Sequence, residues 1–540
     1  MGEVSPSLQP PEAFFATPSA GVPATPRLES KMTNLKYTPE EPIAAIATAL
    51  APAALGIVRC SGKNCIELFS KIFSRPKALL EAAGNTIVYG WLQAVRSCAS
   101  GDEESERPMS CDNSSLLTPN SSLKIDEVLV SVFRAPKSFT GEDMIEISCH
   151  GGVHVVQNVY NLLLNSGFRA AERGEFTFRA YINGKADLTK AEAVREIIDS
   201  KTDESQGRAA GRLAGNLYEA IDGVKKHIVD TLAAIEVEIE YPEDEETIAD
   251  SFDSTELKKA EAMLEQLASS WKSEKIYQDG ARVVLCGRTN AGKSSLFNAL
   301  LKEDRAIVSD IEGTTRDFIE SWIDFSGIPA RLFDTAGLRK TSDVIEAVGV
   351  ERTRDLSGEA DLILYLVDST SGLNEDDKKF IEEHINGHMN GKTTDFSETR
   401  SKTDSQVLPA LPSLPIILIW NKCDVESGTS ANGFEQLPQV RISAKKGIGL
   451  GELSEAVRKA LSVSESTERG ITGLGSERQK VSVEKALESV RHALELTEDY
   501  ALDAVVQDLE DSLDALGEVT GDVTPDDVLG SIFSHFCVGK

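Results

Sequence analysis

Residues able to bind a phosphate chain lie close together in the stretch RVVLCGRTNAGKSSLFNAL, residues 282–300. An apolar run, a G-x4-G-K-S loop and an amphipathic run follow one another, so the pattern predicts a strand, a phosphate-binding loop and a helix. Gly287 and Gly292 would let backbone N–H groups face the phosphates. Lys293 would neutralise the β- and γ-phosphate oxygens, and Ser294 would ligate Mg²⁺. The same loop supplies three further predicted nucleotide-binding residues, Asn290, Ala291 and Ser295.

Motifs farther along the chain complete a predicted guanine-nucleotide site. DIEGTTRD, residues 310–317, offers Thr315 as a second Mg²⁺ ligand, and Asp334 of DTAG ends a predicted strand near that ion. Asp424 of IILIWNKCD can accept hydrogen bonds from both the ring N–H and the amino group of guanine. Adenine lacks this pair of donors, so GTP is favoured over ATP. The remaining predicted nucleotide-binding residues are Ser309, Asp310, Ile311, Glu312, Gly313, Thr314, Thr335, Ala336, Gly337, Asn421, Lys422, Ser443, Ala444 and Lys445.

A residue typical of hydrolytic sites is missing from this set. The position after DTAG is Leu338, where Ras-like proteins keep the Gln that orients the attacking water. A leucine side chain cannot hydrogen-bond to water. If the chain hydrolyses a nucleotide, another group must therefore take over that role.

Four stretches of differing periodicity predict the elements that must position these residues. Residues 41–186 alternate short β-type runs with helical patterns and predict an α+β domain. Residues 187–276 are helical in pattern, with Thr189 able to cap the first helix. Residues 277–466 alternate strand and helix, as in a doubly wound sheet, and residues 467–540 return to helical periodicity. The two helical stretches predict a discontinuous helical domain into which a Ras-like GTPase domain is inserted.

The composition predicts a soluble, multidomain protein. A chain of 540 residues suggests three or four domains. Its net charge of −31 argues against a general nucleic-acid-binding surface, because phosphate binding uses clustered Lys and Arg. No window approaches the ~18 consecutive apolar residues of a membrane-spanning helix. The eight cysteines form no C-x-x-C pair and no metal-binding spacing, which fits a reducing compartment.

Three polar segments are expected to lie outside the folded domains. Residues 1–40 are rich in Pro, Ser and Ala and lack the apolar stretch of a secretory signal, so they predict a disordered tail. Residues 97–122 and 388–415 are polar and predict exposed loop insertions. Without a targeting segment, a cytoplasmic location is expected.

The motifs taken together resemble one known family. The resemblance to the MnmE (TrmE) family of tRNA-modification GTPases is carried by GRTNAGKSSLFN, AIVSDIEGTTRD, DTAGLR, IEAVGVER and the terminal FCVGK. SFTGEDMIEISCHGG and ERGEFTFRAYINGKADLTKAEAVREIIDS extend it to the N-terminal domain. It therefore covers nearly the whole chain beyond residue 40, outside the two insertions. A terminal Cys-x-Gly-Lys combined with a phosphate-binding loop is highly specific.

This resemblance implies how hydrolysis proceeds without the Gln. Family members use K⁺ bound beside the phosphates, and their G domains dimerise across the nucleotide. Glu346, twelve residues beyond Asp334, would orient the water; the alternative is an ordinary solvated helix residue. Ser309 departs from the more usual Thr but keeps a hydroxyl. The implied K⁺ ligands are Asn290, Ser309, the carbonyl of Ile311, and Thr314.

The resemblance also implies a one-carbon site in the N-terminal domain. The resemblance implies that 5,10-methylene-tetrahydrofolate, or alternatively 5-formyl-tetrahydrofolate, binds there. A carboxylate such as Glu146 suits the donor edge of a pterin, and cations suit the carboxylate tail of folate. Alanines in TALAPAALG replace the usual Gly-rich loop, so the path of that loop is in question. The implied folate-binding residues are Arg59, Glu146, Lys185 and Lys540. In the alternative interpretation, the cations among them are ordinary surface residues.

Cys537 of the terminal tetrapeptide is the implied second catalytic residue. A thiol that enters the folate pocket could act as nucleophile or acid. Packing or targeting of the tail is the alternative role.

The function implied by the resemblance is a K⁺-dependent GTPase that installs an aminomethyl or carboxymethylaminomethyl group at C5 of the wobble uridine U34 in tRNA. The protein would be a homodimer and would form a heterotetramer with an FAD-containing MnmG-type partner. FAD is expected on the partner, because no G-x-G-x-x-G fingerprint follows a predicted strand here. GTP hydrolysis would drive opening and closing of the G domains. The alternative is an Era/EngA-like regulatory or ribosome-assembly GTPase, which the charge and the terminal tetrapeptide disfavour.

Overall fold

The computed structural model describes residues 41–94, 123–240, 254–302, 319–334, 360–386, 415–425, 434–461, 473–497 and 502–539. The predicted tail and the first predicted insertion lie outside these ranges, as does the second insertion apart from Pro415. Within the ranges, no helix has both the length and the apolar character needed to cross a membrane.

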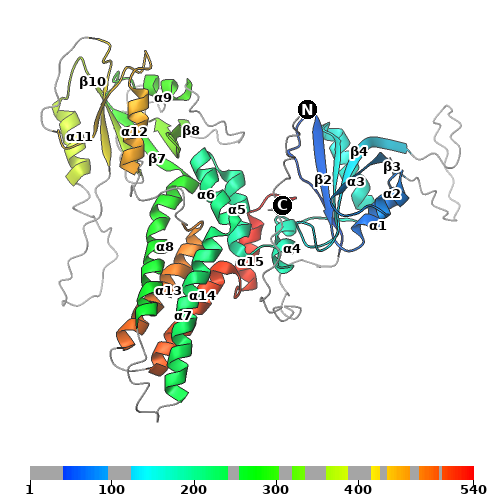
Figure 1. Ribbon diagram of the computed structural model, residues 1–540. Coiled ribbons are helices and arrows are strands. Elements are labelled where there is room, and N and C mark those ends of the chain that lie inside the picture. Colours follow the sequence, from blue (N-terminus) through cyan, green and yellow to red (C-terminus); the bar gives the residue numbers. More distant parts are fainter. Residues whose placement is uncertain are drawn as a thin grey trace, which may run out of the picture.

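The N-terminal unit is built on a six-stranded sheet in the order β3-β4-β5-β2-β1-β6 (Figure 1). Neighbouring strands run antiparallel, except that β1 and β6 are parallel. The strands are β1 (Ile43–Ile46), β2 (Leu55–Ser61), β3 (Thr86–Ala94), β4 (Leu123–Phe133), β5 (Met144–His150) and β6 (Arg169–Ala170). Three helices accompany them, namely α1 (Cys65–Ser70), α2 (Pro76–Leu80) and α3 (Val153–Asn165).

One face of this sheet carries the core of the N-terminal unit. Phe69 of α1 and Val159 of α3 pack in one apolar cluster with Val130 of β4. On the opposite face, Ile87 of β3 and Leu129 of β4 are exposed. This alternation follows from the two-residue period of a strand whose sheet is covered on one side.

Helices that precede and follow the α/β unit in sequence share one apolar core. Leu217 and Leu264 from the first group cluster with Val483 and Leu516 from the second. The long helices α7, α8, α13 and α14 lie side by side in Figure 1. The helices of this part are α4 (Glu175–Ile182), α5 (Leu188–Asp199), α6 (Asp203–Ala214), α7 (Asn216–Glu240), α8 (Thr255–Asp279), α13 (Glu477–Thr497), α14 (Leu502–Thr520) and α15 (Asp526–Ser534).

The cap of α5 differs from the one expected. Asp187 is the capping residue, and its carboxylate accepts a hydrogen bond from the backbone N–H of Lys190 at 3.0 Å. The prediction of Thr189 was wrong, because Thr189 already lies within the helix. Its hydroxyl instead hydrogen-bonds to the Asp187 carboxylate. Asp187 has the extended backbone that an N-cap requires.

The α/β unit has a second six-stranded sheet in the order β12-β11-β10-β7-β9-β8. Its strands are parallel apart from the antiparallel pair β8–β9. They are β7 (Ala281–Gly287), β8 (Ile319–Phe325), β9 (Ile328–Asp334), β10 (Leu362–Asp368), β11 (Ile416–Asn421) and β12 (Gln439–Arg441). Helices α9 (Lys293–Lys302) and α12 (Leu450–Leu461) pack in one core, and α11 (Glu375–Asn386) packs in another. Such layering is typical of doubly wound sheets.

The turn between β8 and β9 contacts the helical part of the molecule. Glu204 of α6 pairs with Arg458 of α12 at 3.2 Å, and Arg458 donates to the carbonyl of Ser326 at 3.1 Å. Where α8 leads into β7, Gly280 has a φ of 75°, and an added Cβ would lie 2.4 Å from the Trp322 ring. A glycine is therefore required at this connection.

Arg212 joins the two chain segments that connect the α/β unit to the helices. Its guanidinium bonds to Glu274 of α8 at 2.8 Å, shortly before β7 begins. It also donates to the carbonyl of Gly473 at 3.3 Å, in the segment that leads into α13. Glu196 of α5 is a third partner at 2.6 Å. Both connections are thus held by one buried cation.

Candidate functional site

The phosphate-binding loop between β7 and α9 has the backbone that its sequence requires. Gly287, Asn290 and Gly292 have φ values of 130°, 66° and 102°. A Cβ at Gly287 would lie 2.3 Å from the carbonyl oxygen of Leu366, and one at Gly292 would lie 2.1 Å from Nδ2 of Asn421. No larger residue fits either place, so the loop keeps its N–H groups accessible to a phosphate chain.

Lys293 is the first residue of α9 and turns back over the loop. Its Nζ donates to the carbonyls of Gly287 at 2.6 Å and Arg288 at 2.9 Å. Phosphate oxygens would compete for the same ammonium group, because a charged acceptor binds it more strongly than a carbonyl does. Ser294 and Ser295 follow in the first turn of α9, where an anion is favoured. These residues therefore fit a Mg²⁺–nucleotide complex.

Asn421 joins the phosphate-binding loop to the loop that follows β12. It is buried at the end of β11, and its Nδ2 donates to the carbonyl of Ala291 at 2.8 Å. Its Oδ1 accepts from the backbone N–H of Ala444 at 3.0 Å. The side-chain amide of Asn421 thus connects Ala291 and Ala444, which were predicted to bind the nucleotide from two other motifs.

The surroundings of Asp424 favour its ionised form, which can accept hydrogen bonds. The Ser443 hydroxyl donates to Oδ1 at 2.7 Å, and this bond lowers the pKa of Asp424 below its ordinary value. Lys446 lies 3.4 Å from Oδ2. Lys445, a predicted nucleotide-binding residue, is exposed. Lys422 pairs instead with Asp368 at 2.6 Å, at the end of the neighbouring strand β10.

Two residues predicted for the N-terminal pocket are partners of each other. Arg59 and Glu146 lie opposite one another on β2 and β5. Nε and Nη2 of Arg59 bond to Oε1 of Glu146 at 2.9 and 2.7 Å. The guanidinium also lies near the rings of Phe139 and Phe176, at 5.8 and 5.7 Å from their centroids. Lys185 is exposed near this region, beside Gly141.

The C-terminal tetrapeptide lies against this pocket. Nη1 of Arg59 donates to the carbonyl of Gly539 at 3.2 Å. Val538 forms a β-bridge with Arg173, and the N–H of Gly174 donates to the carbonyl of Cys537 at 3.5 Å. The tail is thereby placed beside Arg59, and the Cys537 side chain is exposed.

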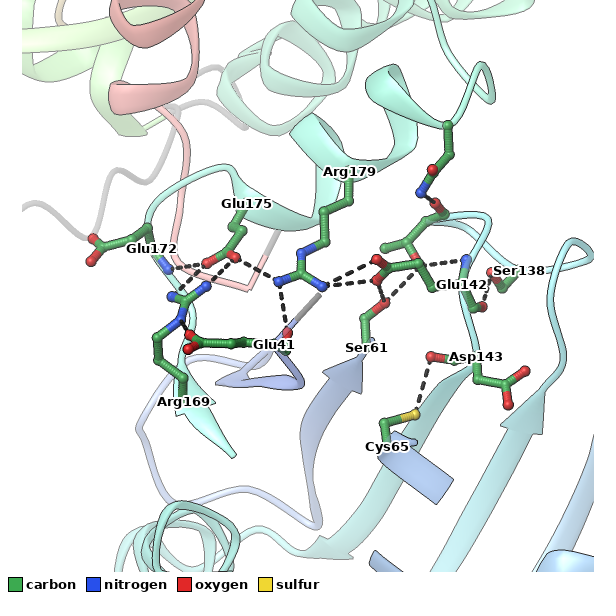
Figure 2. Close-up of polar contacts among 12 residues, drawn as sticks. Glu41, Ser61, Cys65, Ser138, Glu142, Asp143, Arg169, Glu172, Glu175 and Arg179 are labelled. Carbon is green, nitrogen blue, oxygen red and sulfur yellow. Dashed lines mark hydrogen bonds and ion pairs between the residues drawn. The ribbon is translucent and has the colours of Figure 1, made fainter. Parts of the chain in front are cut away.

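A largely buried charged network joins β2, α4, β6 and the loop before β5 (Figure 2). Arg179 of α4 donates to both oxygens of Glu142 at 3.2 and 3.0 Å, and to Oε1 of Glu175 at 2.9 Å. Arg169 binds the same Glu175 from β6. Ser61 of β2 donates to Glu142 at 2.8 Å. The loop that contains Phe139 and Glu142 is thus held against α4 and the sheet.

Comparisons with known proteins identify the family of this chain. A family model described as the MnmE helical domain matches residues 188–537, and one described as the GTP-binding protein TrmE N-terminus matches residues 42–185. The chain is 48% identical over 520 residues to the tRNA modification GTPase MnmE of Treponema denticola, covering 94% of this chain and 99% of that protein. The chain belongs to the MnmE (TrmE) family. The Carboxydothermus hydrogenoformans MnmE is 38% identical over 514 residues, 93% of this chain and 100% of that protein.

Membership of the MnmE family confirms the resemblance and makes the protein a GTP hydrolase. It also confirms the predicted combination of a G domain with a helical domain. Among solved structures, Aquifex aeolicus Era is 25% identical, with a TM-score of 0.24, over 39% of this chain and 66% of that one.

Of the remaining residues predicted from the MnmE motifs, Asp334 is described through its backbone and the others lie outside the described residues. Asp334 ends β9, and its backbone is paired in register with Leu285 of β7, two residues before Gly287. The predictions outside the described ranges are Ser309, Asp310, Ile311, Glu312, Gly313, Thr314, Thr315, Thr335, Ala336, Gly337, Glu346 and Lys540.

Sequence reasoning missed the charged residues that support the MnmE pocket. Glu175 and Arg179 are nearly fully buried, although their types are ordinarily exposed. The available signal was their position within EFTFRA, where two charged residues stand four apart among apolar ones. That spacing places them on one helix face and predicts an ion pair.

Proposed function

We propose that the protein is a cytoplasmic, K⁺-dependent GTPase that modifies C5 of the wobble uridine of tRNA together with an FAD-containing MnmG-type partner. The one-carbon donor is 5,10-methylene-tetrahydrofolate, or alternatively 5-formyl-tetrahydrofolate, bound in the N-terminal domain. The aminomethyl or carboxymethylaminomethyl group is formed there, while the G domain supplies the conformational cycle.

The observation that carries this proposal is the contact between Arg59 and the terminal tetrapeptide. It brings Gly539, two residues beyond Cys537, to the guanidinium of Arg59, 480 residues away in sequence. A regulatory GTPase has no need to place a terminal thiol against a separate domain. The contact therefore supports modification chemistry over the Era-like alternative.

The donor set of the pocket fits a reduced folate. Arg59, with Lys185 and Lys540, would bind the carboxylates of the folate tail. Phe139, which is 40% exposed, supplies apolar surface beside the guanidinium, as ligand pockets usually do, while the fully buried ring of Phe176 packs behind it. Glu146 has one oxygen engaged by Arg59, so it would meet the pterin edge as part of an ion pair. The bound folate supplies the one-carbon group.

In the G domain, we assign the residues from the family pattern. K⁺ would be held by Asn290 with Ser309, Ile311 and Thr314, and Mg²⁺ by Ser294 and Thr315. The backbone of Asn290 already has a positive φ, which turns the loop at the proposed K⁺ position. Glu346 would orient the attacking water in place of the missing Gln.

A homodimer formed through the N-terminal domain is part of the proposal. Ile87 and Leu129 are 66% and 48% exposed on the uncovered face of the N-terminal sheet. Apolar side chains gathered on an open face favour burial against a partner, and a second copy of the chain is the occupant we propose. Leu129→Glu is expected to shift the protein from dimer to monomer in light scattering after gel filtration. A dimer that persists in this variant would place the interface elsewhere.

The decisive experiment is reconstitution of the modification. Full-length protein, an MnmG-type partner, tRNA, methylene-tetrahydrofolate, GTP and KCl are combined, and the nucleosides are measured by mass spectrometry. We expect modified uridine with the wild type and at least a tenfold lower yield with Cys537→Ser or Arg59→Met, with GTP turnover retained. Arg195→Met, which removes an exposed arginine of α5, is the control and should behave as wild type.

The opposite result is equally informative. If the wild type hydrolyses GTP but forms no modified uridine and binds no folate, the protein is a regulatory GTPase and the proposal fails.

A further inference from the structure

We propose that Asp377 is a positioning residue of the phosphate-binding loop, acting through the side chain of Arg288. Arg288 is the second residue of the G-x4-G-K-S loop, and Asp377 lies in the first turn of α11. The nucleotide motifs do not include Asp377, because it is separated from them by 89 positions (377 − 288).

The Arg288 side chain is held at both ends of its guanidinium. Nε lies 2.9 Å from Oδ2 of Asp377, and Nη2 donates to the carbonyl of Gly372 at 2.5 Å. Gly372 belongs to the segment that joins β10 to α11, and Asp377 belongs to the first turn of α11. The side chain therefore ties the loop to the start of α11 and to the segment before it.

Asp377 is itself fixed in place. Its side chain is 1% exposed, and besides Arg288 it accepts from the Tyr365 hydroxyl at 2.7 Å and from the N–H of Asn374 at 2.9 Å. Burial raises the pKa of Tyr365, and Asp377 adds to the shift, so the phenol stays protonated and donates. A buried carboxylate with three donors from three segments is a rigid anchor.

This anchor completes the support of the loop. The backbone carbonyl of Arg288 is one of the two that hold Lys293. The far side of the loop is held by Asn421 through Ala291. Asn421 therefore holds one half of the loop, and Asp377 holds the other half through Arg288. A loop held at both ends loses less conformational freedom when it surrounds a phosphate chain, so the nucleotide binds more tightly.

The first test measures nucleotide affinity of the full-length chain. Asp377→Asn keeps the size of the side chain and removes its charge. Using fluorescent mant-GDP and a mant-labelled non-hydrolysable GTP analogue, we expect both affinities to fall about tenfold, the loss typical when a group supporting a binding residue is removed. The preference for GDP over ADP should not change, because the base contacts are elsewhere.

Two control variants separate positioning from stability. Glu375→Gln removes an exposed acid from the same turn of α11, where it pairs with Lys378, and should bind as wild type. Ile381→Val trims a fully buried residue of α11 and should lower the melting temperature while affinity stays within about twofold.

A double-mutant cycle then tests whether Arg288 transmits the effect. Arg288→Met should weaken binding to a similar extent, and adding Asp377→Asn to it should cause little further loss. Arg288→Lys should restore part of the affinity, because an ammonium can still reach a carboxylate.

The inference is overturned by either of two results. The Arg288 side chain is 34% exposed, so Arg288→Met should fold. This variant therefore tests the inference even if Asp377→Asn does not fold. If Arg288→Met binds mant-GDP as tightly as wild type, no positioning occurs through that side chain. If Asp377→Asn weakens binding equally with and without Arg288, the residue acts only on the stability of α11.

Discussion

At the scale of single residues, the predicted guanine site combines a carboxylate whose pKa is lowered with a bridging amide. The Ser443 hydroxyl stabilises the charged form of Asp424. Asn421 holds the phosphate-binding loop and the loop after β12 at a fixed distance. One buried side chain therefore connects the loop predicted to bind the phosphates with the loop predicted to bind the base.

Asp424→Asn is predicted to weaken GDP binding about 100-fold or more, because two hydrogen bonds to a charged acceptor are lost. The wild-type affinity should stay constant from pH 8 down to about pH 5, because the lowered pKa of Asp424 keeps the carboxylate charged there. Mant-GDP titrations across this range measure both effects. Asp376→Asn, an exposed acid of α11, is the control. Unchanged affinity in Asp424→Asn would show that the base is read elsewhere.

At the scale of elements, the hairpin of β8 and β9 connects two regions of the molecule. At its open end, Ile319 is paired with Asp334. This end lies beside β7, the strand that leads into the phosphate-binding loop. Its turn contacts Arg458, which is paired with Glu204 of α6. The helical part thus touches an element that ends at the nucleotide site, and the cluster around Arg212 holds both connecting segments nearby.

Glu196 in this cluster makes stability depend on pH. Burial raises its pKa from about 4.5 to about 7, although Arg212 opposes the shift. The folded protein therefore holds this proton more tightly than the unfolded chain does, and the free energy of unfolding should fall as pH rises from 4.5 through 7. The loss is on the order of 3 kcal/mol, at about 1.36 kcal/mol for each pKa unit.

Chemical denaturation at several pH values measures that slope. Glu196→Gln should flatten it, and Glu219→Gln, an exposed acid of α7, should leave it in place. A slope that persists in Glu196→Gln would assign the proton to another group.

At the scale of the whole molecule, the C-terminal segment connects the helices to the N-terminal pocket. Phe533 and Phe536 pack with Phe178 and Leu188, and the chain then continues to the Arg59 contact. Docking of the last helix therefore brings the terminal segment within hydrogen-bonding distance of Arg59.

Phe533→Ala should release this segment. The side chain is 2% exposed, and its loss costs about 3–5 kcal/mol in a packed core. Limited proteolysis should then cut the chain after Thr520 faster than in wild type, while Val538→Ala, which trims an exposed side chain, should cut at the wild-type rate. Equal resistance in Phe533→Ala would mean that other contacts hold the tail.

Sequence reasoning succeeded where chemistry is encoded locally and failed where it depends on distant pairing. The strand, loop and helix around Lys293 follow from adjacent residues, and so does the run of buried residues in β11. The pairing of Arg59 with Glu146 depends on the register of β2 and β5, which no local pattern contains. The support of Arg288 by Asp377 likewise appears only once α11 packs beside the loop.

The account depends most on the claim that a cation and an acid replace the Gln missing at Leu338. GTP turnover measured in KCl and in NaCl, with Glu346→Ala in parallel, tests it directly. The predicted result is turnover about 100-fold faster in KCl, with most of that activity lost in Glu346→Ala. Equal turnover in the two salts, unchanged by Glu346→Ala, would contradict it.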